Sequence, residues 1–298
     1  MTRSRTRRSA AHVATTLATG AMLVGLTALV GCSNIETDAA PPPVPDAGEV
    51  TADTSPAGGV VPPPAGARPD YQLGGAYEPA AGVGIVGRDR GADPAEGRYS
   101  ICYVNGFQTQ PNEQQLWEPD LVLTVAGEPL ADPDWPDEIL LDTSTTQKRD
   151  RILSRVEPWI RGCAEAGFDA VEFDNLDSFT RSEGLLDVEA NLALASAFVG
   201  VAHDAGLAAG QKNAAEYAPR LRDEAGFDFA VVEECAAYAE CGEYTAVYGD
   251  AVVDIEYTDN LPRAWSTICA DPATPRSVVL RDRDLTVESD PEHIARHC

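Results

Sequence analysis

The sequence predicts an α/β protein whose folded part is a single (β/α)8 TIM-type barrel. The first observation is a repeated unit in which a helical pattern is followed by glycine and then by a short apolar run, at Gly167, Gly206 and Gly226. Glycine just past a helix is typical of a C-terminal cap, and a strand after each helix indicates parallel strands joined by crossover helices. The second observation is length, because residues 69–298 form a unit of about 230 residues, which suits one barrel.

The expected elements follow from apolar periodicity. Helical patterns occupy 148–166, 189–205 and 217–225. Strands are expected at 82–86, 99–104, 138–141, 170–173, 207–210, 229–232, 252–255 and 278–280. Residues 71–73 and 121–125 are further strand candidates, so the number of strands stays open. Eight principal candidates favour a closed barrel over an open doubly wound sheet.

Residues 1–31 have the features of an export signal. Several arginines precede an apolar run at 17–30, which is too short and wrongly flanked for a membrane span. The run ends in Leu-Val-Gly-Cys, which resembles the bacterial lipoprotein cleavage box and makes Cys32 the expected lipidation site. An ordinary secretory signal is the alternative. We therefore expect an exported protein on the outer side of the cell membrane, attached only through an N-terminal lipid anchor.

Residues 32–68 are expected to be a disordered tether. They contain two Pro-Pro-Pro runs, several Gly and Asp, and almost no large apolar residue. Such a composition buries too little surface to offset the entropy of ordering. The functional unit is then the domain at 69–298, which we expect to be monomeric.

The charge balance restricts the possible partners. The chain has 22 Lys and Arg against 48 Asp and Glu, for a net charge of −26. Nucleic acid and anionic lipid are bound through clustered basic residues, so neither is expected as a partner of the domain. The acidic excess favours a cationic partner or substrate, although a strongly solvated acidic surface is an equally simple explanation.

The chain has seven cysteines, and lipidation of Cys32 leaves six. An even number in an exported protein favours disulfides over metal ligation. Three pairs are expected, although sequence alone does not fix their connectivity: Cys235–Cys241, which closes a short loop, Cys102–Cys163 and Cys269–Cys298. No Cys-x-x-Cys pattern is present, and the Gly-x-Gly-x-x-Gly spacing at 82–87 lies inside an expected strand, so we expect neither a metal nor a cofactor.

Carboxylates follow or end several of the expected strands. They are Asp89, Asp142, Glu172, Asp174, Glu233, Glu234 and Glu256. In a barrel the chemistry lies at the carboxyl ends of the strands, so these side chains converge on one face. Lys212, Asn175 and Asn213 lie among them. The set describes a pocket for general acid and base chemistry on an uncharged or cationic polyol.

Several short motifs resemble one known family. They are Glu172-Phe173-Asp174-Asn175-Leu176-Asp177, Gln211-Lys212-Asn213, Phe227-Asp228-Phe229, Glu233-Glu234-Cys235 and Ile255-Glu256-Tyr257. In this order they resemble glycoside hydrolase family 114, which contains the endo-α-1,4-polygalactosaminidases. The resemblance extends from about residue 71 to 280. It implies a (β/α)8 hydrolase that cleaves α-1,4 linkages in a partly or wholly deacetylated galactosamine polymer, without a metal.

The resemblance also implies site residues. Asp174 corresponds to the Asp of the family's Asp-Asn pair, and Glu233 to the Glu before its cysteine-containing loop. We expect Asp174 to be the nucleophile and Glu233 the acid/base. The chain departs from the expected Glu-Gln-Cys, because Glu234 stands where Gln is expected, so Glu234 is an alternative to Glu233.

Other residues of the motifs are expected to bind substrate. They are Asp89, Tyr103, Glu172, Asn175, Asp177, Lys212, Asn213, Glu256 and Tyr257. Glu172 or Asp177 would pair with a sugar amino group, and capping of a helix is the alternative for Asp177. Lys212 is expected to lower the pKa of a catalytic carboxyl through an ion pair. The amides would either orient hydroxyl groups or satisfy backbone groups, and the two tyrosines would stack on sugar faces unless they belong to the core.

Two other functions fit the same residues. The first is a noncatalytic polysaccharide-binding lipoprotein built on the same barrel. The second is a glycosidase of a different amino-sugar polymer. Because a binding module does not require two carboxylates at the motif positions, Asp174 and Glu233 favour the enzyme.

Overall fold

The computed structural model describes residues 59–298. The expected signal at 1–31, the lipidation site Cys32 and the tether up to residue 58 therefore lie outside the described residues. Within 59–298, none of the helices combines the length and the apolar character needed to cross a membrane.

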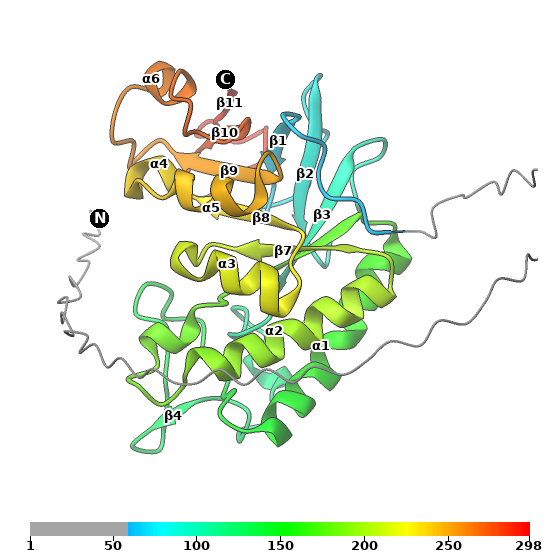
Figure 1. Cartoon of the computed structure of the whole chain (residues 1–298), viewed down its shortest axis with the longest axis vertical. Helices are drawn as coiled ribbons and strands as arrows, with labels where there is room; N and C mark the ends of the chain where they lie inside the picture. Colours follow the sequence, from blue (N-terminus) through cyan, green and yellow to red (C-terminus); the bar gives the residue numbers. More distant parts are fainter. Residues whose placement is uncertain (1–58) are drawn as a thin grey trace, which may run out of the picture. The chain divides into compact units, whose positions relative to one another are not determined.

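Eight parallel strands form the barrel that the sequence predicts (Figure 1). They are β1 (Arg68–Tyr71), β2 (Val83–Asp89), β3 (Tyr99–Asn105), β6 (Ala170–Asp174), β7 (Ala208–Lys212), β8 (Phe229–Glu233), β9 (Val252–Tyr257) and β10 (Ser277–Arg281). Each pairs in parallel with the next, and the short β11 (Ala295–His297) pairs antiparallel with β10. The carboxyl ends of the parallel strands therefore share one face, as a (β/α)8 fold requires.

A buried arginine links the first and last parallel strands. Arg281 of β10 is fully buried, and its guanidinium donates hydrogen bonds to the Asp70 carboxylate at 2.9 Å and to the Tyr71 carbonyl, both on β1. It also donates to the Ile294 carbonyl at 2.8 Å. An unpaired guanidinium in this position would be strongly destabilising, so its partners hold the seam together.

Helices cover the later strands. They are α1 (Thr146–Ala166), α2 (Val188–Asp204), α3 (Ala218–Arg220), α4 (Cys235–Tyr238), α5 (Cys241–Tyr248) and α6 (Trp265–Cys269), with 3-10 turns η1 (Gln114–Leu116), η2 (Ser178–Arg181) and η3 (Ala215–Tyr217) and a π-helical turn η4 (Leu221–Ala225). The expected helices 148–166 and 189–205 correspond to α1 and α2, which lie side by side in Figure 1. The interval 217–225 is split between α3 and η4, and it ends at Gly226 with φ of 92°.

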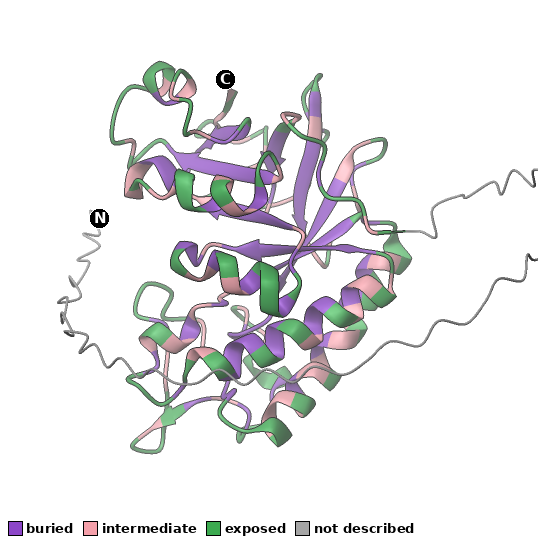
Figure 2. Cartoon of the chain, viewed as in Figure 1, coloured by how far each residue is buried: buried purple, intermediate pink, exposed green. Residues whose placement is uncertain are grey.

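Two apolar layers enclose the strands. Inside the barrel, Ile85, Ile101, Phe229 and Val279 pack with other apolar residues and with the rings of Tyr71 and Tyr257. Outside it, the opposite faces of the strands pack against the helices, with Phe173 stacked on Phe198 of α2 at 5.2 Å between ring centroids. The strands are accordingly buried over nearly their whole length (Figure 2). This rigid frame fixes the side chains at the strand ends.

The expectation of a barrel strand at 138–141 is wrong. These residues make isolated antiparallel bridges to 108, 122 and 131 within the long β3–α1 connection, which also carries the hairpin β4 (Thr124–Val125) and β5 (Glu128–Pro129). Leu140 and Leu141 are completely buried within this insertion and not in the sheet. The short apolar run does not distinguish the two environments, and the missing barrel strand is supplied by β1.

The expected tether also ends earlier than residue 68. Val60 and Ala67 pack against the apolar residues inside the barrel, and Pro63 is buried. The Tyr99 hydroxyl, at the start of β3, donates a hydrogen bond of 2.6 Å to the Val61 carbonyl. Residues 59–67 therefore lie against the amino-terminal ends of the strands, opposite the face where the carboxylates are expected.

Residues 59–298 contain three disulfides, and they are the pairs expected above. Cys102–Cys163 joins β3 to α1, Cys235–Cys241 joins α4 to α5, and Cys269–Cys298 ties the end of α6 to the C-terminal residue. The first two lie beside strands that carry predicted site residues.

Candidate active site

Three neighbouring strands end in the same way. Asp174, Lys212 and Glu233 are the last residues of β6, β7 and β8. The next residue in each case has a left-handed backbone, with φ of 64° at Asn175, 51° at Asn213 and 62° at Glu234. The chain turns away at this point, so the last side chain of each strand is left in the mouth of the barrel. Asn adopts this conformation readily, whereas Glu does so at some cost.

Lys212 lies between the two predicted catalytic carboxylates. Its Nζ is 3.7 Å from Oδ2 of Asp174 and 3.3 Å from Oε2 of Glu233. The lysine side chain is only 3% exposed, whereas Asp174 and Glu233 are 18% and 27% exposed. The ammonium is therefore covered from solvent, while both carboxylates keep access to a molecule in the mouth.

Two tyrosine hydroxyls hold the carboxylates in place. Tyr103 donates to Oδ2 of Asp174 at 2.7 Å, and Tyr257 donates to Oε1 of Glu233. Both rings are more than nine-tenths buried, so neither presents a face for stacking on a sugar. The expected stacking role is therefore replaced by a positioning role, because their hydroxyls reach the mouth while the rings fill the barrel.

A third carboxyl lies beneath the pair. Glu172 is fully buried, and its Oε1 accepts a hydrogen bond of 2.8 Å from the Tyr71 hydroxyl, whereas its Oε2 has no partner in residues 59–298. Burial raises the pKa of Glu172 to about 7, although Lys212 opposes this shift. It is therefore too deep for the expected contact with a sugar amino group. Tyr71, which the sequence did not identify as a site residue, belongs to this layer.

The charges within the site are mutually dependent. Burial alone would lower the pKa of Lys212, but Asp174, Glu233 and Glu172 raise it above its usual value. Burial likewise would raise the pKa of Glu233, but Lys212 and the hydrogen bonds from Tyr257 and Asn213 outweigh it and lower this pKa. An ionised Glu233 therefore faces a permanently charged Lys212, as expected for the lysine.

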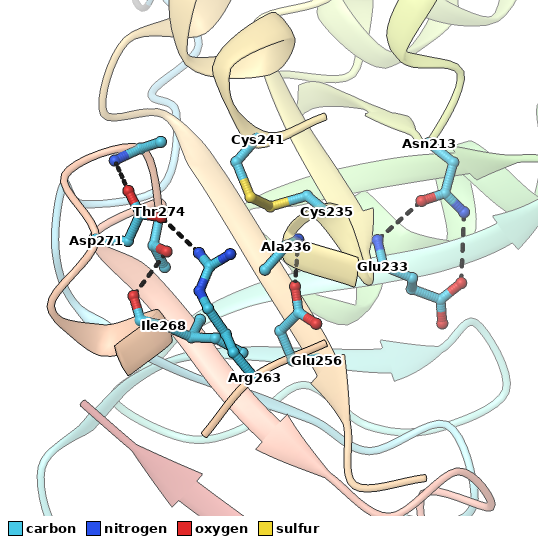
Figure 3. The surroundings of a disulfide bond; sticks show 11 residues. Asn213, Glu233, Cys235, Ala236, Cys241, Glu256, Arg263, Ile268, Asp271 and Thr274 are labelled. Atoms are coloured by element: carbon cyan, nitrogen blue, oxygen red, sulfur yellow. Dashed lines mark hydrogen bonds and ion pairs between the residues drawn. A yellow bond between two sulfur atoms is a disulfide. The ribbon is translucent and has the colours of Figure 1, made fainter. Parts of the chain in front are cut away.

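Asn213 and Asn175 lie beside the carboxylates. Asn213 accepts a 2.8 Å hydrogen bond from the Glu233 backbone amide and lies 3.4 Å from its Oε2 (Figure 3). Asn175 Nδ2 donates to the Asn105 side-chain oxygen at 3.0 Å. Both amides are thus used in fixing the strand ends, and each remains only partly buried beside the mouth.

An arginine organises the rim beside Asp174. Arg181 of η2 donates to Asp177 at 2.8 Å and to Asn175 at 2.7 Å, and it is paired with the buried Asp132 of the insertion. Asp177 is therefore neutralised by Arg181 and makes no side-chain capping hydrogen bond to η2. Neither Arg181 nor Asp132 was predicted, because they lie in a loop and an insertion that only folding brings together.

Glu138 of the insertion also reaches this rim, and the sequence analysis missed it as a site residue. Its Oε2 accepts hydrogen bonds from Asn105 at 2.9 Å and from Asn175 at 3.5 Å. Burial and the nearby Asp174 raise the pKa of Glu138 to about 7. Sequence reasoning missed Glu138 because it is the first residue of a short run, 138–141, that has the pattern of an ordinary strand.

Three other candidates lie away from the carboxylate pair. Glu234 is 2% exposed and is held by Arg283 at 2.7 Å and by Asn260 at 2.9 Å, which leaves little freedom for an alternative catalytic role. Asp89 accepts from Gln110 at 2.8 Å at the end of β2. Glu256 faces outward from β9 and is fully buried, so the expected substrate contact is wrong for this residue.

Glu256 instead supports the turn that follows Glu233. Its Oε1 accepts a hydrogen bond of 2.6 Å from the Ala236 backbone amide at the start of α4 (Figure 3). The Cys235–Cys241 disulfide fastens the same turn to α5. The chain immediately after Glu233 is therefore held from two sides, which restrains the carboxylate.

One group of potential metal ligands occurs among the described residues. It consists of Cys235, Cys241, Asp254 and Glu256, with their ligand atoms within 4.8 Å of one another. Because the two sulfurs are joined in a disulfide, only the two carboxylates could coordinate an ion. The arrangement is a poor match to a zinc site, and it lies on the outer side of β9, away from the mouth.

The family comparison agrees with this geometry. The model of glycoside hydrolase family GH114 matches residues 50–298. The chain belongs to family GH114. No curated protein matches the sequence significantly.

Two solved structures show the same fold. Ega3 from Aspergillus fumigatus, solved in complex with galactosamine, is 22% identical, with 79% of this chain and 96% of that chain aligned and a TM-score of 0.61. The glycoside hydrolase domain of PelA from Pseudomonas aeruginosa is 14% identical, with 76% of this chain and 98% of that chain aligned and a TM-score of 0.53. At these identities the likeness establishes the barrel, and the GH114 match establishes the family.

Proposed function

We propose that this GH114 protein is an endo-acting hydrolase that cleaves α-1,4 linkages in a cationic, galactosamine-containing polysaccharide, with Asp174 and Glu233 as its catalytic carboxylates. The observation that supports this most is the pair itself, which faces one buried ammonium in the mouth of the barrel. The galactosamine bound to Ega3 supports the class of sugar. The acidic excess of the chain is the charge complement of such a polymer.

The spacing of the carboxylates is compatible with a double-displacement reaction. Because both oxygens lie within 3.7 Å of Lys212 Nζ, they are at most about 7 Å apart. Retaining glycosidases place their carboxyl groups about 5 to 5.5 Å apart, and inverting ones about 6.5 to 9.5 Å. The limit includes the retaining distance and only the short end of the inverting range. One carboxylate would attack the anomeric carbon, and the other would protonate the leaving oxygen and then activate water.

We assign Asp174 as the nucleophile and Glu233 as the acid/base. The lowered pKa of Glu233 places a condition on this assignment, because the acid must carry a proton when the bond breaks. A sugar that displaces water from the partly exposed Glu233 would raise its pKa in the complex. In the free enzyme only a small protonated fraction remains at neutral pH, so kcat/KM should increase toward acidic pH.

The cellular setting is a second part of the proposal. We propose export, attachment to the outer side of the membrane through acylated Cys32, and a monomeric domain. The Leu-Val-Gly-Cys box and the preceding arginines support the anchor. Membrane fractionation of wild type and Cys32→Ala tests it. Loss of membrane retention in the variant is expected, and equal retention of both would refute the anchor.

Hydrolysis is tested by reducing-end release from deacetylated α-1,4-galactosaminan. Wild type should release new ends, whereas Asp174→Asn and Glu233→Gln should be reduced by several orders of magnitude. Glu234→Gln is the matched control, because this neighbouring glutamate is already held by Arg283. Binding without release by wild type would favour the noncatalytic binding module, and release from a different amino-sugar polymer alone would change the substrate.

A further inference from the structure

Glu138 is held at the rim by its insertion. The three residues after it make antiparallel bridges to other parts of the β3–α1 connection. Leu140 and Leu141 are completely buried there. The backbone of this segment is therefore fixed, and the Glu138 side chain reaches the ends of β3 and β6.

Only one of the two carboxylate oxygens of Glu138 accepts hydrogen bonds from residues 59–298. Both of its hydrogen bonds, from Asn105 and Asn175, go to Oε2. Within residues 59–298, Oε1 accepts no hydrogen bond, and it is not among the buried atoms that lack a partner. Oε1 therefore keeps some accessible surface, and Asp174 is near enough to raise the pKa of Glu138.

The acidic residues near Glu138 differ from it, because each of them either forms an ion pair with a lysine or arginine or is buried from solvent. Arg181 neutralises Asp132 and Asp177, and Lys212 is shared by Asp174 and Glu233. Glu172 lies below the mouth with no exposed surface. In the described part of the chain, no lysine, arginine or histidine nitrogen lies within 4.0 Å of the Glu138 carboxylate. A carboxylate in this position lacks its counterion.

An amino sugar would supply that counterion. Burial favours the neutral form of Glu138, and so do the nearby Asp174 and Asp132. Asn105 and Arg181 favour its ionised form. The resulting pKa of about 7 leaves the Glu138 carboxyl partly protonated at neutral pH. An ammonium placed at Oε1 would favour the carboxylate, so its binding would release a proton.

We propose that Glu138 binds the ammonium group of a galactosamine unit beside the scissile bond and thereby selects deacetylated over N-acetylated sugar. This inference rests on the proposed function, since it identifies the residue that binds the sugar amino group at the same site. An acetamido group carries no charge and is bulkier, so it would lose the charge-assisted hydrogen bond at Oε1. The two earlier candidates, Glu172 and Asp177, are respectively buried and neutralised.

The test compares Glu138→Gln with wild type on matched sugars. Galactosamine and N-acetylgalactosamine binding are measured calorimetrically at pH 7 in two buffers of different ionisation enthalpy. Wild type should bind galactosamine with release of a fraction of a proton. Glu138→Gln should bind galactosamine about tenfold to a hundredfold more weakly, without proton release, and N-acetylgalactosamine as wild type does. Glu128→Gln, an exposed glutamate of the same insertion, is the control.

Each result decides the inference. An equal loss for both sugars, no loss for either, or an unchanged proton release in Glu138→Gln would overturn it. The proton release of wild type is an independent measurement that needs no variant, and its absence would also overturn the inference. Hydrolysis of acetylated and deacetylated polymer at equal rates would reject Glu138 as the selector while leaving the hydrolase intact. Absence of hydrolysis would reject the proposed function, and the binding measurement would still decide the role of Glu138.

Discussion

Replacement of Lys212 by methionine tests the electrostatic core of the site. Lys212→Met keeps an unbranched side chain of similar length and removes the charge shared by Asp174 and Glu233. At separations of 3.3 and 3.7 Å and an effective dielectric constant of about 20, Coulomb's law gives about 4 to 5 kcal/mol for each ion pair. Because both carboxylates are partly exposed, water screens this energy, and loss of Lys212 should raise the pKa of Glu233, which the lysine lowers in wild type.

The consequence is a displacement of the pH profile. A nucleophilic Asp174 must be ionised when it attacks, and Lys212 is its ion-pair partner. An acid Glu233 must be protonated, so the alkaline limb follows the pKa of Glu233, which Lys212 and its hydrogen bonds lower in wild type. Without Lys212, the alkaline limb should move to higher pH. If Glu233 were instead the nucleophile, it would have to be ionised, and its higher pKa in Lys212→Met would move the acidic limb of the profile to higher pH.

The assay is kcat/KM for reducing-end release at closely spaced pH values between 3 and 9. Lys148→Met is the matched control, because it removes the only other lysine of the chain, whose partner is Asp142. Its profile should coincide with that of wild type. An alkaline limb of Lys212→Met that coincides with that of wild type would refute the electrostatic reasoning, because the charge that lowers the pKa of Glu233 has been removed.

Three further changes have defined outcomes. Tyr257→Phe removes a hydrogen bond to Glu233 and should lower kcat about tenfold with little change in melting temperature, so an unchanged kcat would argue against a positioning role. Serine at both Cys235 and Cys241 should cost about 2 kcal/mol of stability and also lower kcat, whereas loss of the C-terminal disulfide should affect melting temperature alone. Burial raises the pKa of Asp254, so its folded form binds more protons above about pH 4 and the contribution of this group to wild-type stability falls as pH rises. Asp254→Asn should therefore raise the melting temperature relative to wild type more at pH 8 than at pH 5, and a pH-independent difference would contradict this.

The sequence by itself determined the barrel and the positions of its charged strand ends. Apolar runs after Gly167, Gly206 and Gly226 are local patterns, and each corresponds to β6, β7 or β8. Because strand ends share one face in a parallel barrel, the same patterns bring Asp174 and Glu233 together. The disulfide pairs also follow the expectation, although spacing alone left their connectivity open.

The tertiary structure decided what the remaining side chains do. Tyr103 and Tyr257 are buried and act through their hydroxyls, and Glu256 faces away from the mouth on the outer side of β9. Side-chain alternation along a strand can be read from the sequence only once its register is known, and a shift of one residue reverses the face.

Glu138 shows most clearly what local sequence patterns do not predict. Its short apolar run has the pattern of a barrel strand, yet it belongs to an insertion that folds over the carboxyl ends of β3 and β6. Local periodicity describes a segment's own conformation, whereas contacts between residues far apart in the chain depend on how the segments pack. The sequence therefore determined the frame and the convergence of Asp174 and Glu233, and packing alone decided which further carboxylate lies at the rim.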